Sequence, residues 1–360
     1  MNPRVAMVIN TSGLAYDDRL RKECDSLRRV GAQPEILALE RRNHAARGST
    51  DAGHPFRTVE LVSRRWLPHN RGLVVKLLEL YGRMVADLLR RSPDVAWIHD
   101  PDLGGVVAAG IVLRRLGVIR RLVWDQHELP PMAMLRSTTG RALLAGTMAR
   151  CDAIVVANRE RGAHLAEVLG PRVAARLHVL DNYSDAVFND RPAGRLPDEL
   201  RSWLAGRPFL LAQGGANPRR FLDQLVAAVL RRTDLALVVV GPYLDSVLTR
   251  LRDRFGETLA ARVRFTGLVP QMDLVDYIDE ALASVVLYDE DVLNSRLCAP
   301  NRLYQALSRG VPAVVGCNPP LARVVTEHGC GVVLERDGRD VDDLDLGLQR
   351  LLADADALRA

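Results

Sequence analysis

Short apolar runs alternate with longer amphipathic stretches along most of the chain. The runs have the length of buried strands, and the stretches repeat apolar residues at the helical period. In the first half we predict strands at 5–9, 33–39, 59–61, 95–99, 122–125, 153–157 and 177–180. Helices are predicted there at 17–30, 72–90, 103–116, 140–149 and 159–169, with a polar loop at 41–54. This alternation indicates a parallel sheet wrapped by helices.

The alternation stops at 182–208, where prolines and glycines gather as in a linker, and it then restarts. In the second half, strands are predicted at 209–212, 235–240, 263–265, 283–288, 311–315 and 331–334, and helices at 219–231, 245–255, 272–280 and 341–358. We therefore predict an α/β protein of two Rossmann-like domains facing each other across a cleft. The predicted parts are an N-terminal domain at 1–185, a linker at 186–207, a second domain at 208–340 and a C-terminal helix at 341–360.

The segment 299–312 combines a turn, a short amphipathic helix, a glycine stop and a new strand. Pro300 favours the turn, and Gly310 can end the helix in a left-handed conformation. The helix leaves three polar side chains at the mouth of the predicted sheet, those of Asn301, Arg302 and Gln305. Nucleotides bind at that edge in open α/β folds, so these residues are candidates for nucleotide binding.

The bulk composition excludes several classes of protein. The chain has 360 residues, 48% of them hydrophobic and 26% charged, as expected for a globular protein of two domains. Its net charge of +5 is mild, and no basic run is interleaved with aromatics, which argues against a nucleic-acid partner. The five scattered cysteines contain no CxxC pair, so neither a disulfide framework nor structural zinc is predicted, and a reducing cytoplasm fits. The start does not read as a signal peptide, and the longest apolar stretch, 104–113, is too short to span a bilayer.

Four motifs spread over nearly the whole chain carry a family resemblance. They are the stretch 17–23 (DDRLRKE), the strand ends 98–100 with 123–130 (IHD and VWDQHELP), the run 213–215 followed by 218–220 (QGG and PRR), and 299–312 (APNRLYQALSRGVP). Together they resemble the GT-B glycosyltransferases, in particular the large retaining group that uses sugar nucleotides. The resemblance implies transfer of a sugar from a nucleoside-diphosphate sugar to an acceptor hydroxyl. It implies no bound cofactor, and a final helix that can return to the N-terminal domain.

On the donor side, the resemblance implies a set of cations and glycines around the diphosphate. Arg220 matches the family's phosphate-binding lysine, and Arg302 matches a second basic position. Arg219 can substitute if the helix begins one residue earlier; otherwise these arginines are solvated at helix starts. Asn301 either fixes the turn or meets the donor. Three glycines either form simple turns or let backbone amides approach phosphates, namely Gly13, Gly214 and Gly215.

The chain departs from the family at two donor positions. Where many members have two glutamates separated by seven residues, this chain has Leu297 and Gln305. A glutamine can still bind a ribose hydroxyl, but a leucine cannot bind a sugar. Because no Asp-x-Asp stands beside a further carboxylate, with 100–102 coming closest, we predict no metal site and expect cationic side chains to stabilise the leaving group.

On the acceptor side, His127 matches the family's active-site histidine beside the donor sugar. It either positions the sugar or simply caps a strand end. Glu128 either orients His127 or binds an acceptor hydroxyl, and Asp100 either contacts substrate or makes local hydrogen bonds. If Asp17 caps the first helix, Arg19 faces the cleft; otherwise it is a surface arginine.

From these assignments we expect the protein to bind two substrates: a nucleotide-sugar donor, and a sugar, lipid-linked or small-molecule acceptor. A basic, partly apolar patch runs over 64–67 to Arg71 and Lys76, and it is either a solvated face or a point of contact with a membrane. The expected location is accordingly the cytoplasm or the inner face of its membrane. Two alternatives remain open: a GT-B sugar-nucleotide epimerase, and a catalytically impaired partner protein that binds sugar nucleotides.

Overall fold

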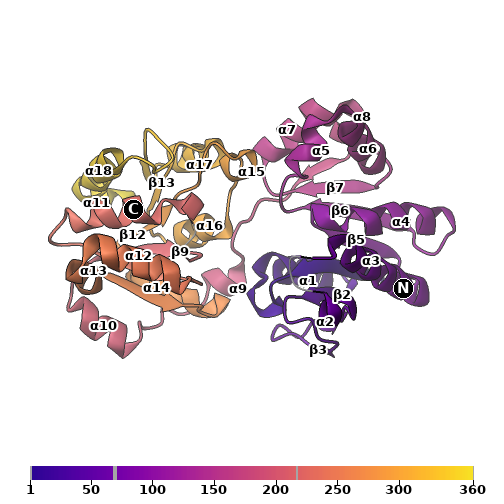
Figure 1. Cartoon of the computed structure of the whole chain (residues 1–360), viewed down its shortest axis with the longest axis horizontal. Coiled ribbons are helices and arrows are strands. Elements are labelled where there is room, and N and C mark those ends of the chain that lie inside the picture. The colour runs from indigo at the N-terminus through magenta and orange to yellow at the C-terminus, as the bar shows by residue number, and fades with distance from the viewer. Residues whose placement is uncertain (1, 68–70, 216–217, 360) are drawn as a thin grey trace. The chain divides into compact units, whose positions relative to one another are not determined.

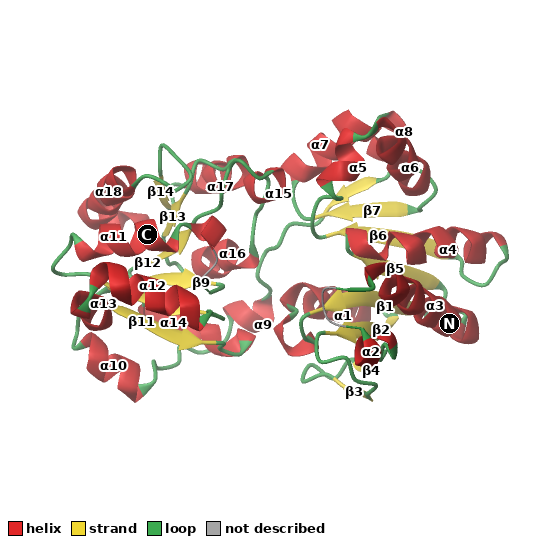
Figure 2. Ribbon diagram, viewed as in Figure 1, coloured by secondary structure: helices red, strands yellow, loops and turns green. Residues whose placement is uncertain are grey.

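The computed structural model describes residues 2–67, 71–215 and 218–359. The chain divides into two compact units, Met1–Asp181 (unit 1) and Asn182–Ala360 (unit 2). Each unit is built around a sheet of mainly parallel strands covered by helices, as Figures 1 and 2 show. The α/β architecture predicted from the alternating pattern is confirmed.

The sheet of unit 1 has the strand order β3-β4-β2-β1-β5-β6-β7-β8, and only β3 is antiparallel to its neighbour. Its strands are β1 (Arg4–Thr11), β2 (Gln33–Glu40), β3 (Arg47–Ser49), β4 (Pro55–Thr58), β5 (Val95–His99), β6 (Arg121–Gln126), β7 (Ala153–Val156) and β8 (Leu177–Val179). The strand order reverses beside β1, and this reversal opens a crevice at the carboxyl ends of β1 and β5.

The helices of unit 1 follow the predicted pattern, with three short additions. The long ones are α1 (Asp18–Arg29), α3 (Leu73–Arg91), α4 (Gly104–Arg115), α6 (Thr138–Met148) and α7 (Arg159–Leu169). The short ones are α2 (Ser63–Trp66), α5 (Met132–Arg136) and α8 (Pro171–Ala174), joined by the 3-10 turns η1 (Leu14–Tyr16) and η2 (Pro101–Leu103). A single turn contains too few residues for an apolar period to show, which is why the short helices were not predicted.

The edge of this sheet was predicted wrongly. The strand expected at 59–61 lies instead at β4, and the expected loop 41–54 contains β3. In β4 the buried side chain of Arg57 pairs with Asp87. Because a charged residue occupies this buried position, the strand lacks the apolar pattern by which it could have been predicted. All three residues of β3 are exposed, so that strand carries no apolar signal.

Unit 2 contains a six-stranded, all-parallel sheet in the order β11-β10-β9-β12-β13-β14. Its strands are β9 (Phe209–Gln213), β10 (Ala236–Val240), β11 (Val263–Gly267), β12 (Ala283–Val286), β13 (Ala313–Val315) and β14 (Gly331–Val333). Its longer helices are α11 (Leu222–Leu230), α12 (Asp245–Phe255), α16 (Asn301–Ser308), α17 (Pro319–His328) and α18 (Val341–Arg359). The shorter ones are α9 (Ala186–Asn189), α10 (Asp198–Leu204), α13 (Glu257–Arg262), α14 (Leu274–Glu280) and α15 (Leu293–Arg296), with the 3-10 turns η3 (Pro218–Arg220) and η4 (Gln271–Asp273).

Both ends of unit 2 fold into its core. The segment 186–207, expected to be a linker, contains α9 and α10, and its residues Phe188 and Leu200 are buried against β9 and β10. Helix α18 buries Leu344, Leu348 and Leu351 in the core that also holds residues of α11 and β14. The apolar residues at both ends therefore complete the core of unit 2.

Two helix boundaries in unit 2 bear on the site. Helix α16 ends as predicted, with Gly310 in the left-handed region at φ 70°. The helix predicted at 219–231 begins only at Leu222, because Phe221 adopts φ 50°. Arg220 therefore lies in the 3-10 turn η3 and not in the first turn of a helix.

Candidate functional site

Unit 1 gathers its chemistry at the carboxyl ends of β5 and β6. The two strands are parallel neighbours, with His99 opposite Asp125, so the residues that follow them meet at one edge. The Asp100 amide donates to the Asp125 carbonyl at 2.8 Å. A pocket of about 520 Å³ opens there. Its lining comprises Asn10, Asp100, Pro101, Asp102, His127, Glu128, Leu129 and Pro131.

Arg19 is a buried residue that joins two carboxylates. The Asp17 side chain accepts a hydrogen bond from the Leu20 amide at 3.2 Å, so the predicted helix cap is confirmed. The Arg19 Nη2 lies 3.2 Å from both carboxylate oxygens of Asp125, and its Nε lies 3.0 Å from Glu23 Oε1. Its guanidinium thus balances negative charge inside unit 1, and the surface alternative is excluded.

Two histidines are packed against each other beside this ion pair. His99 is fully buried, and its Nδ1 lies 3.1 Å from His127 Nε2. Burial, with the neighbouring His127, lowers the pKa of His99 to about 3. Burial and the charges of Arg19 and Arg161 lower the pKa of His127 well below its usual value. Both rings are therefore neutral at pH 7, and His127 is suited to hydrogen bonding rather than to carrying charge.

Asp100 stands out in both its backbone and its charge. Its φ of 67° and ψ of 150° lie in a region that only glycine occupies readily. Burial, helped by Asp102, Asp17 and Asp125, raises the pKa of Asp100 to about 8. The protonated carboxyl group lies 3.5 Å from His127 Nδ1, so at neutral pH it offers a proton donor beside the histidine.

One group of side chains has a composition that could hold a metal ion. Ligand atoms of Glu23, His99, Asp125 and His127 all lie within 4.8 Å of one another. However, Arg19 already contacts both carboxylates of this group and supplies them with a positive charge. Metal-independent action stays a prediction.

In unit 2, two arginines converge at the end of β9. The Arg302 Nη1 donates to the Gln213 carbonyl, and the Arg220 Nη1 donates to the Gly214 carbonyl. The guanidinium carbons of Arg302 and Arg220 lie 4.7 Å and 5.7 Å from the centre of the Tyr288 ring. Burial, together with the charge of Arg220, lowers the pKa of Arg302 to about 10. Within residues 182–215 and 218–359, neither arginine has a carboxylate partner, so this corner carries uncompensated positive charge.

The two glycines between these arginines are required by close packing. Gly214 and Gly215 have φ values of 94° and 75°. A side chain at Gly214 would strike the Arg220 guanidinium, and one at Gly215 would strike the Pro242 carbonyl. Both amides donate to the Val240 carbonyl, at 2.7 Å and 3.0 Å, so neither is free to bind a phosphate. The glycines allow the arginines to approach the strand end instead.

The remaining predicted residues are less closely grouped. Gln305 is buried on α16, and its Nε2 has no hydrogen-bond partner in the described part of the chain. Arg219 is exposed in η3, Asn301 is the first residue of α16, and Glu128 is exposed at the rim of the unit 1 pocket. Gly13 has φ 169°, an extended conformation open to any residue, so its backbone does not require glycine.

No role could be assigned from the sequence to Glu23 or Asp125, which appeared only as parts of motifs, or to Tyr288. Glu23 lies one turn after Arg19 on α1, and the i, i+4 spacing was the available signal. Tyr288, which lies under both arginines, follows β12 by two residues, a position near a strand's carboxyl end.

Solved structures share the fold of both units. Sucrose-phosphate synthase from Thermosynechococcus elongatus is 17% identical, with 99% of this chain and 92% of that chain covered at a TM-score of 0.74. The α,α-trehalose 6-phosphate synthase from Burkholderia multivorans is 13% identical, with 100% and 93% covered and a TM-score of 0.72. HepE from Anabaena, solved with UDP-glucose, is 14% identical, with 99% and 92% covered and a TM-score of 0.73.

At these identities the likeness establishes the fold alone. The chain has the GT-B fold of these structures, as its motifs led us to expect. No protein-family model matches the chain, and a search of curated proteins finds no match.

Proposed function

We propose that this protein is a glycosyltransferase that moves a sugar from a nucleoside-diphosphate sugar to an acceptor hydroxyl. The observation that carries the proposal is the pair Arg220 and Arg302, which converge on the end of β9 without a carboxylate partner in the described part of unit 2. Buried positive charge is costly unless an anion balances it, and a diphosphate would balance two arginines. The similar fold of HepE, solved with UDP-glucose, supports a nucleotide sugar as donor.

The chemistry assigned to unit 2 is stabilisation of the leaving group. Negative charge develops on the diphosphate as its bond to the sugar breaks. Guanidinium groups of Arg220 and Arg302 stabilise that charge in place of a metal ion. Gln305, with its buried and unpartnered amide nitrogen, is assigned to a ribose hydroxyl, and Asn301 to the donor. The exposed Arg219 is assigned only an outer contact.

The chemistry assigned to unit 1 is positioning of the sugar and the acceptor. In a retaining, front-face reaction the leaving phosphate itself takes the acceptor's proton, so a strong base is unnecessary. A neutral His127 fits this role, because it can bind a sugar hydroxyl without carrying charge. Asp100 and Glu128 line the same pocket and are assigned to acceptor hydroxyls. Arg19 acts through Asp125 as a positioning residue, and Gly13 is assigned to the N-terminal loop.

The acceptor is proposed to be a glycan, a lipid-linked saccharide or a small secondary metabolite. The exposed carboxylate of Glu128 at the pocket rim supports a hydroxyl-bearing acceptor of any of these kinds. All five cysteines are free, which supports the cytoplasm as the proposed location.

Titration calorimetry with UDP, GDP and dTDP tests the donor site. Arg220→Ala and Arg302→Ala should each weaken binding of the preferred diphosphate by more than about tenfold, since charge-assisted contacts contribute about 1.5–3 kcal/mol. The lysine variants should retain part of the affinity because they keep the charge. Arg252→Ala, on the exposed side of α12, is the matched control and should bind as the parent does. Unchanged affinity in both site variants would remove these arginines from the donor site.

A second candidate, a partner protein that binds sugar nucleotides without turnover, is favoured by one observation. Leu297 and Gln305 stand where related enzymes have glutamates, and a leucine cannot hold a sugar hydroxyl. Diphosphate binding with no hydrolysis or transfer across an acceptor panel would support this candidate over the transferase. An epimerase would need added acid and base carboxylates at the donor sugar, and the same two positions argue against it.

A further inference from the structure

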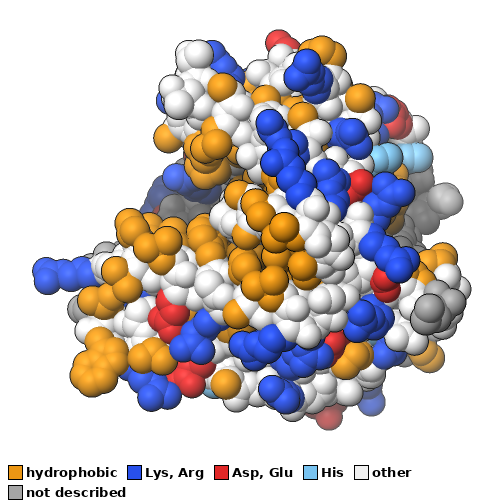
Figure 3. All heavy atoms as spheres, turned by 90° about the vertical axis from the view of Figure 1, so that its right-hand side faces the viewer, with side chains coloured by type: hydrophobic (Ala, Val, Ile, Leu, Met, Phe, Trp, Pro, Cys, Tyr) orange, Lys and Arg blue, Asp and Glu red, His pale blue; other side chains and the backbone are white. Residues whose placement is uncertain are grey.

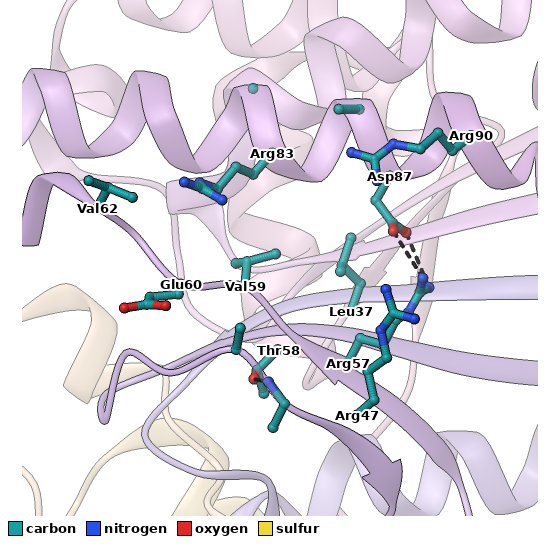
Figure 4. A pocket seen from close by; sticks show the side chains of 14 residues that line it. Leu37, Arg47, Arg57, Thr58, Val59, Glu60, Val62, Arg83, Asp87 and Arg90 are labelled. Atoms are coloured by element: carbon teal, nitrogen blue, oxygen red, sulfur yellow. Dashed lines mark hydrogen bonds and ion pairs between the residues drawn. The ribbon is translucent and has the colours of Figure 1, made fainter.

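A second pocket of unit 1 lies between α3 and the edge strands β3 and β4 (Figure 4). Its volume is about 540 Å³, within the range of about 300–1,000 Å³ that small-molecule sites occupy. Its lining comes from β2, β3, β4, the segments beside these strands, and α3. Because it shares no lining residue with the pocket at the ends of β5 and β6, we treat it separately and call it the edge pocket.

Two small residues keep the edge pocket open on the side of α3. Gly82 and Ala86 both line it, and they are one helical turn apart. A glycine inside a helix destabilises it by about 0.5–1 kcal/mol relative to alanine. Close packing does not require the glycine here, because a Cβ added at Gly82 would meet no atom within 4 Å. The space beside α3 is therefore large enough to accept atoms of a ligand.

The opposite wall of the edge pocket is held in place by two polar side chains. The Thr58 hydroxyl donates to the His44 carbonyl at 2.5 Å and accepts from the Ala46 amide at 2.8 Å. The Asn43 side chain donates to the Leu61 carbonyl at 3.0 Å and accepts from the Leu61 amide at 2.8 Å. These bonds fix the segment 43–46 to β4 and to the residues that follow it. A wall fixed in this way loses little further freedom when a ligand binds.

Positive charge is in excess at one end of the edge pocket. Arg47 lies directly opposite Arg57 in the pairing of β3 with β4, an arrangement that is destabilising for like charges. Asp87 on α3 pairs with Arg57 at 3.0 Å, and Arg90 follows Asp87 by one helical turn. In the described part of the chain, Arg47 and Arg90 make no ion pair or side-chain hydrogen bond. Two guanidinium groups beside the Arg57–Asp87 pair are therefore available to an anion.

The other end of the edge pocket has a different character. Arg83 precedes Arg90 by seven residues, which corresponds to about 10 Å along the helix axis. Its charge is already used, because it pairs with Glu79 at 2.9 Å. Val59 and Val62 also line the pocket, and Figure 4 shows them at the side away from Arg90. The edge pocket thus has a cationic end and a largely apolar end.

The basic patch that the sequence predicted provides less free charge than the edge pocket. Lys76 is buried and does not belong to an exposed patch. Arg65 pairs with Glu60 at 2.6 Å, whereas Arg71 is exposed. Residues 68–70 of that patch lie outside the described residues. Among the described residues, no helix has both the length and the apolar character needed to cross a bilayer.

Basic side chains alone do not mark a site on this protein. Figure 3 shows Lys and Arg side chains spread among apolar ones over one face of the molecule. Arg47 and Arg90 differ from a solvated arginine because they line a preformed cavity that also has an apolar end. The combination of unpaired charge and a cavity is what points to a ligand.

We propose that the edge pocket binds a soluble organic phosphate, a small molecule with one phosphate group and a neutral body. A phosphate monoester carries a charge of about −1.5 to −2 at pH 7, which two guanidinium groups match. Arg47 and Arg90 bind the phosphate, and the body lies beside Gly82 against Val59 and Val62. This inference does not rest on the proposed transferase activity, because the donor diphosphate is assigned to unit 2 and the edge pocket lies within unit 1.

Titration calorimetry of the full chain with phenyl phosphate, glucose 6-phosphate and AMP tests the proposal. The parent should bind at least one of these esters more tightly than inorganic phosphate, because only an ester has a body for the apolar end. Arg47→Ala/Arg90→Ala should weaken that binding by more than about tenfold, since two charge-assisted contacts are lost. Arg47→Lys/Arg90→Lys keeps the charge and should weaken it less.

Two substitutions at Gly82 test where the ligand lies. Gly82→Leu fills the space beside α3 and should weaken ester binding by more than about tenfold. Gly82→Ala adds only a Cβ that meets no atom within 4 Å, so it should retain binding. Both residues favour a helix over glycine, so α3 should stay folded, and circular dichroism checks this. Arg172→Ala removes an exposed arginine on α8 and should bind as the parent does.

A variant of unit 2 separates the edge pocket from the donor site. Arg220→Ala/Arg302→Ala should bind the same ester as the parent does. The proposal is overturned if no ester binds, if inorganic phosphate binds as tightly as every ester, or if the Arg172 control loses as much affinity as the edge-pocket variants. It is also overturned if ester binding depends on Arg220 and Arg302, or if Arg47 and Arg90 bind only vesicles that contain phosphatidylglycerol.

Discussion

Asp100 carries its carboxyl group on a backbone conformation that L-residues rarely adopt. The conformation persists because its neighbours hold it: the Asp100 amide donates to the Asp125 carbonyl, and the Trp124 Nε1 donates to the Asp100 carbonyl at 3.0 Å. Strain of this kind is concentrated at functional sites and costs of order 1–3 kcal/mol. At the scale of single residues, the unit 1 pocket thus holds a strained, protonated acid next to a neutral histidine.

The raised pKa of Asp100 predicts a pH dependence of stability. Its pKa rises from 3.8 to about 8 on folding, so between these values the folded state binds more protons than the unfolded state. The stabilisation that this carboxyl group provides is complete below its unfolded pKa of 3.8 and is lost as the pH rises toward 8. Asp100→Asn cannot ionise and escapes that loss. The melting temperature of Asp100→Asn minus that of the parent should therefore be at least about 2 °C larger at pH 8.5 than at pH 5. This corresponds to roughly 1 kcal/mol in the free energy of unfolding.

Asp51→Asn serves as the control for this prediction, because Asp51 is an exposed aspartate of unit 1 that does not line the pocket of Asp100. Its melting temperature should follow the parent at both pH values. If Asp100→Asn also follows the parent, the carboxyl group is ionised in the folded protein and cannot act as the proposed proton donor.

At the scale of elements, α18 shows how a terminal helix becomes part of a core. Leu344, Leu348 and Leu351 recur at helical spacing and are fully buried, whereas Leu346 on the same helix is 46% exposed. Since only the first three face the sheet, the helix completes the core of unit 2.

Substitutions on α18 should reflect this difference. Leu348→Ala removes a fully buried side chain and should lower the free energy of unfolding by about 2–5 kcal/mol. Leu346→Ala should change it by less than about 1 kcal/mol. Urea denaturation of the full chain, followed by circular dichroism, measures both. Equal, small effects would mean that α18 is only loosely attached.

At the scale of the whole molecule, each unit contributes a different electrostatic character. In unit 1, Arg19 contacts the carboxyl groups of both Glu23 and Asp125. Burial, together with the charge of Asp125, raises the pKa of Glu23 well above its usual value, so a neutral Glu23 leaves one carboxylate opposite one guanidinium. In unit 2, Arg220 and Arg302 are positive without a carboxylate among the described residues. The charge arrangement accordingly favours an anionic donor in unit 2.

This arrangement predicts a reaction that does not need a metal ion. Once a donor and an acceptor are identified, EDTA should leave the turnover unchanged, and added Mg²⁺ or Zn²⁺ should not raise it, because the arginines already supply the positive charge. Metal analysis of the purified chain provides the control for tightly held ions. Turnover lost on chelation and restored by a metal would instead assign an ion to the Glu23, His99, Asp125 and His127 group.

The pattern of apolar positions determined most of the fold. Strands and helices with a clear period lie where predicted within a few residues, as β1, β10 and α12 illustrate, because burial of a face leaves a repeat in the sequence. Elements without such a repeat were missed. Strand β3 is wholly exposed and β4 hides a buried arginine, so neither reads as apolar.

The candidate site, too, could be predicted from the sequence only in part. Motifs at the strand ends indicated Asp100, His127, Arg220 and Arg302 from the sequence through their resemblance to the GT-B glycosyltransferases, and parallel strands bring their carboxyl ends to one edge. Only the tertiary structure decided how these residues are used. It buried Arg19 between Glu23 and Asp125, placed Tyr288 under two arginines, and occupied the glycine amides with Val240. A sequence shows which side chains are present and how they repeat, but charge balance and burial depend on neighbours that are distant along the chain.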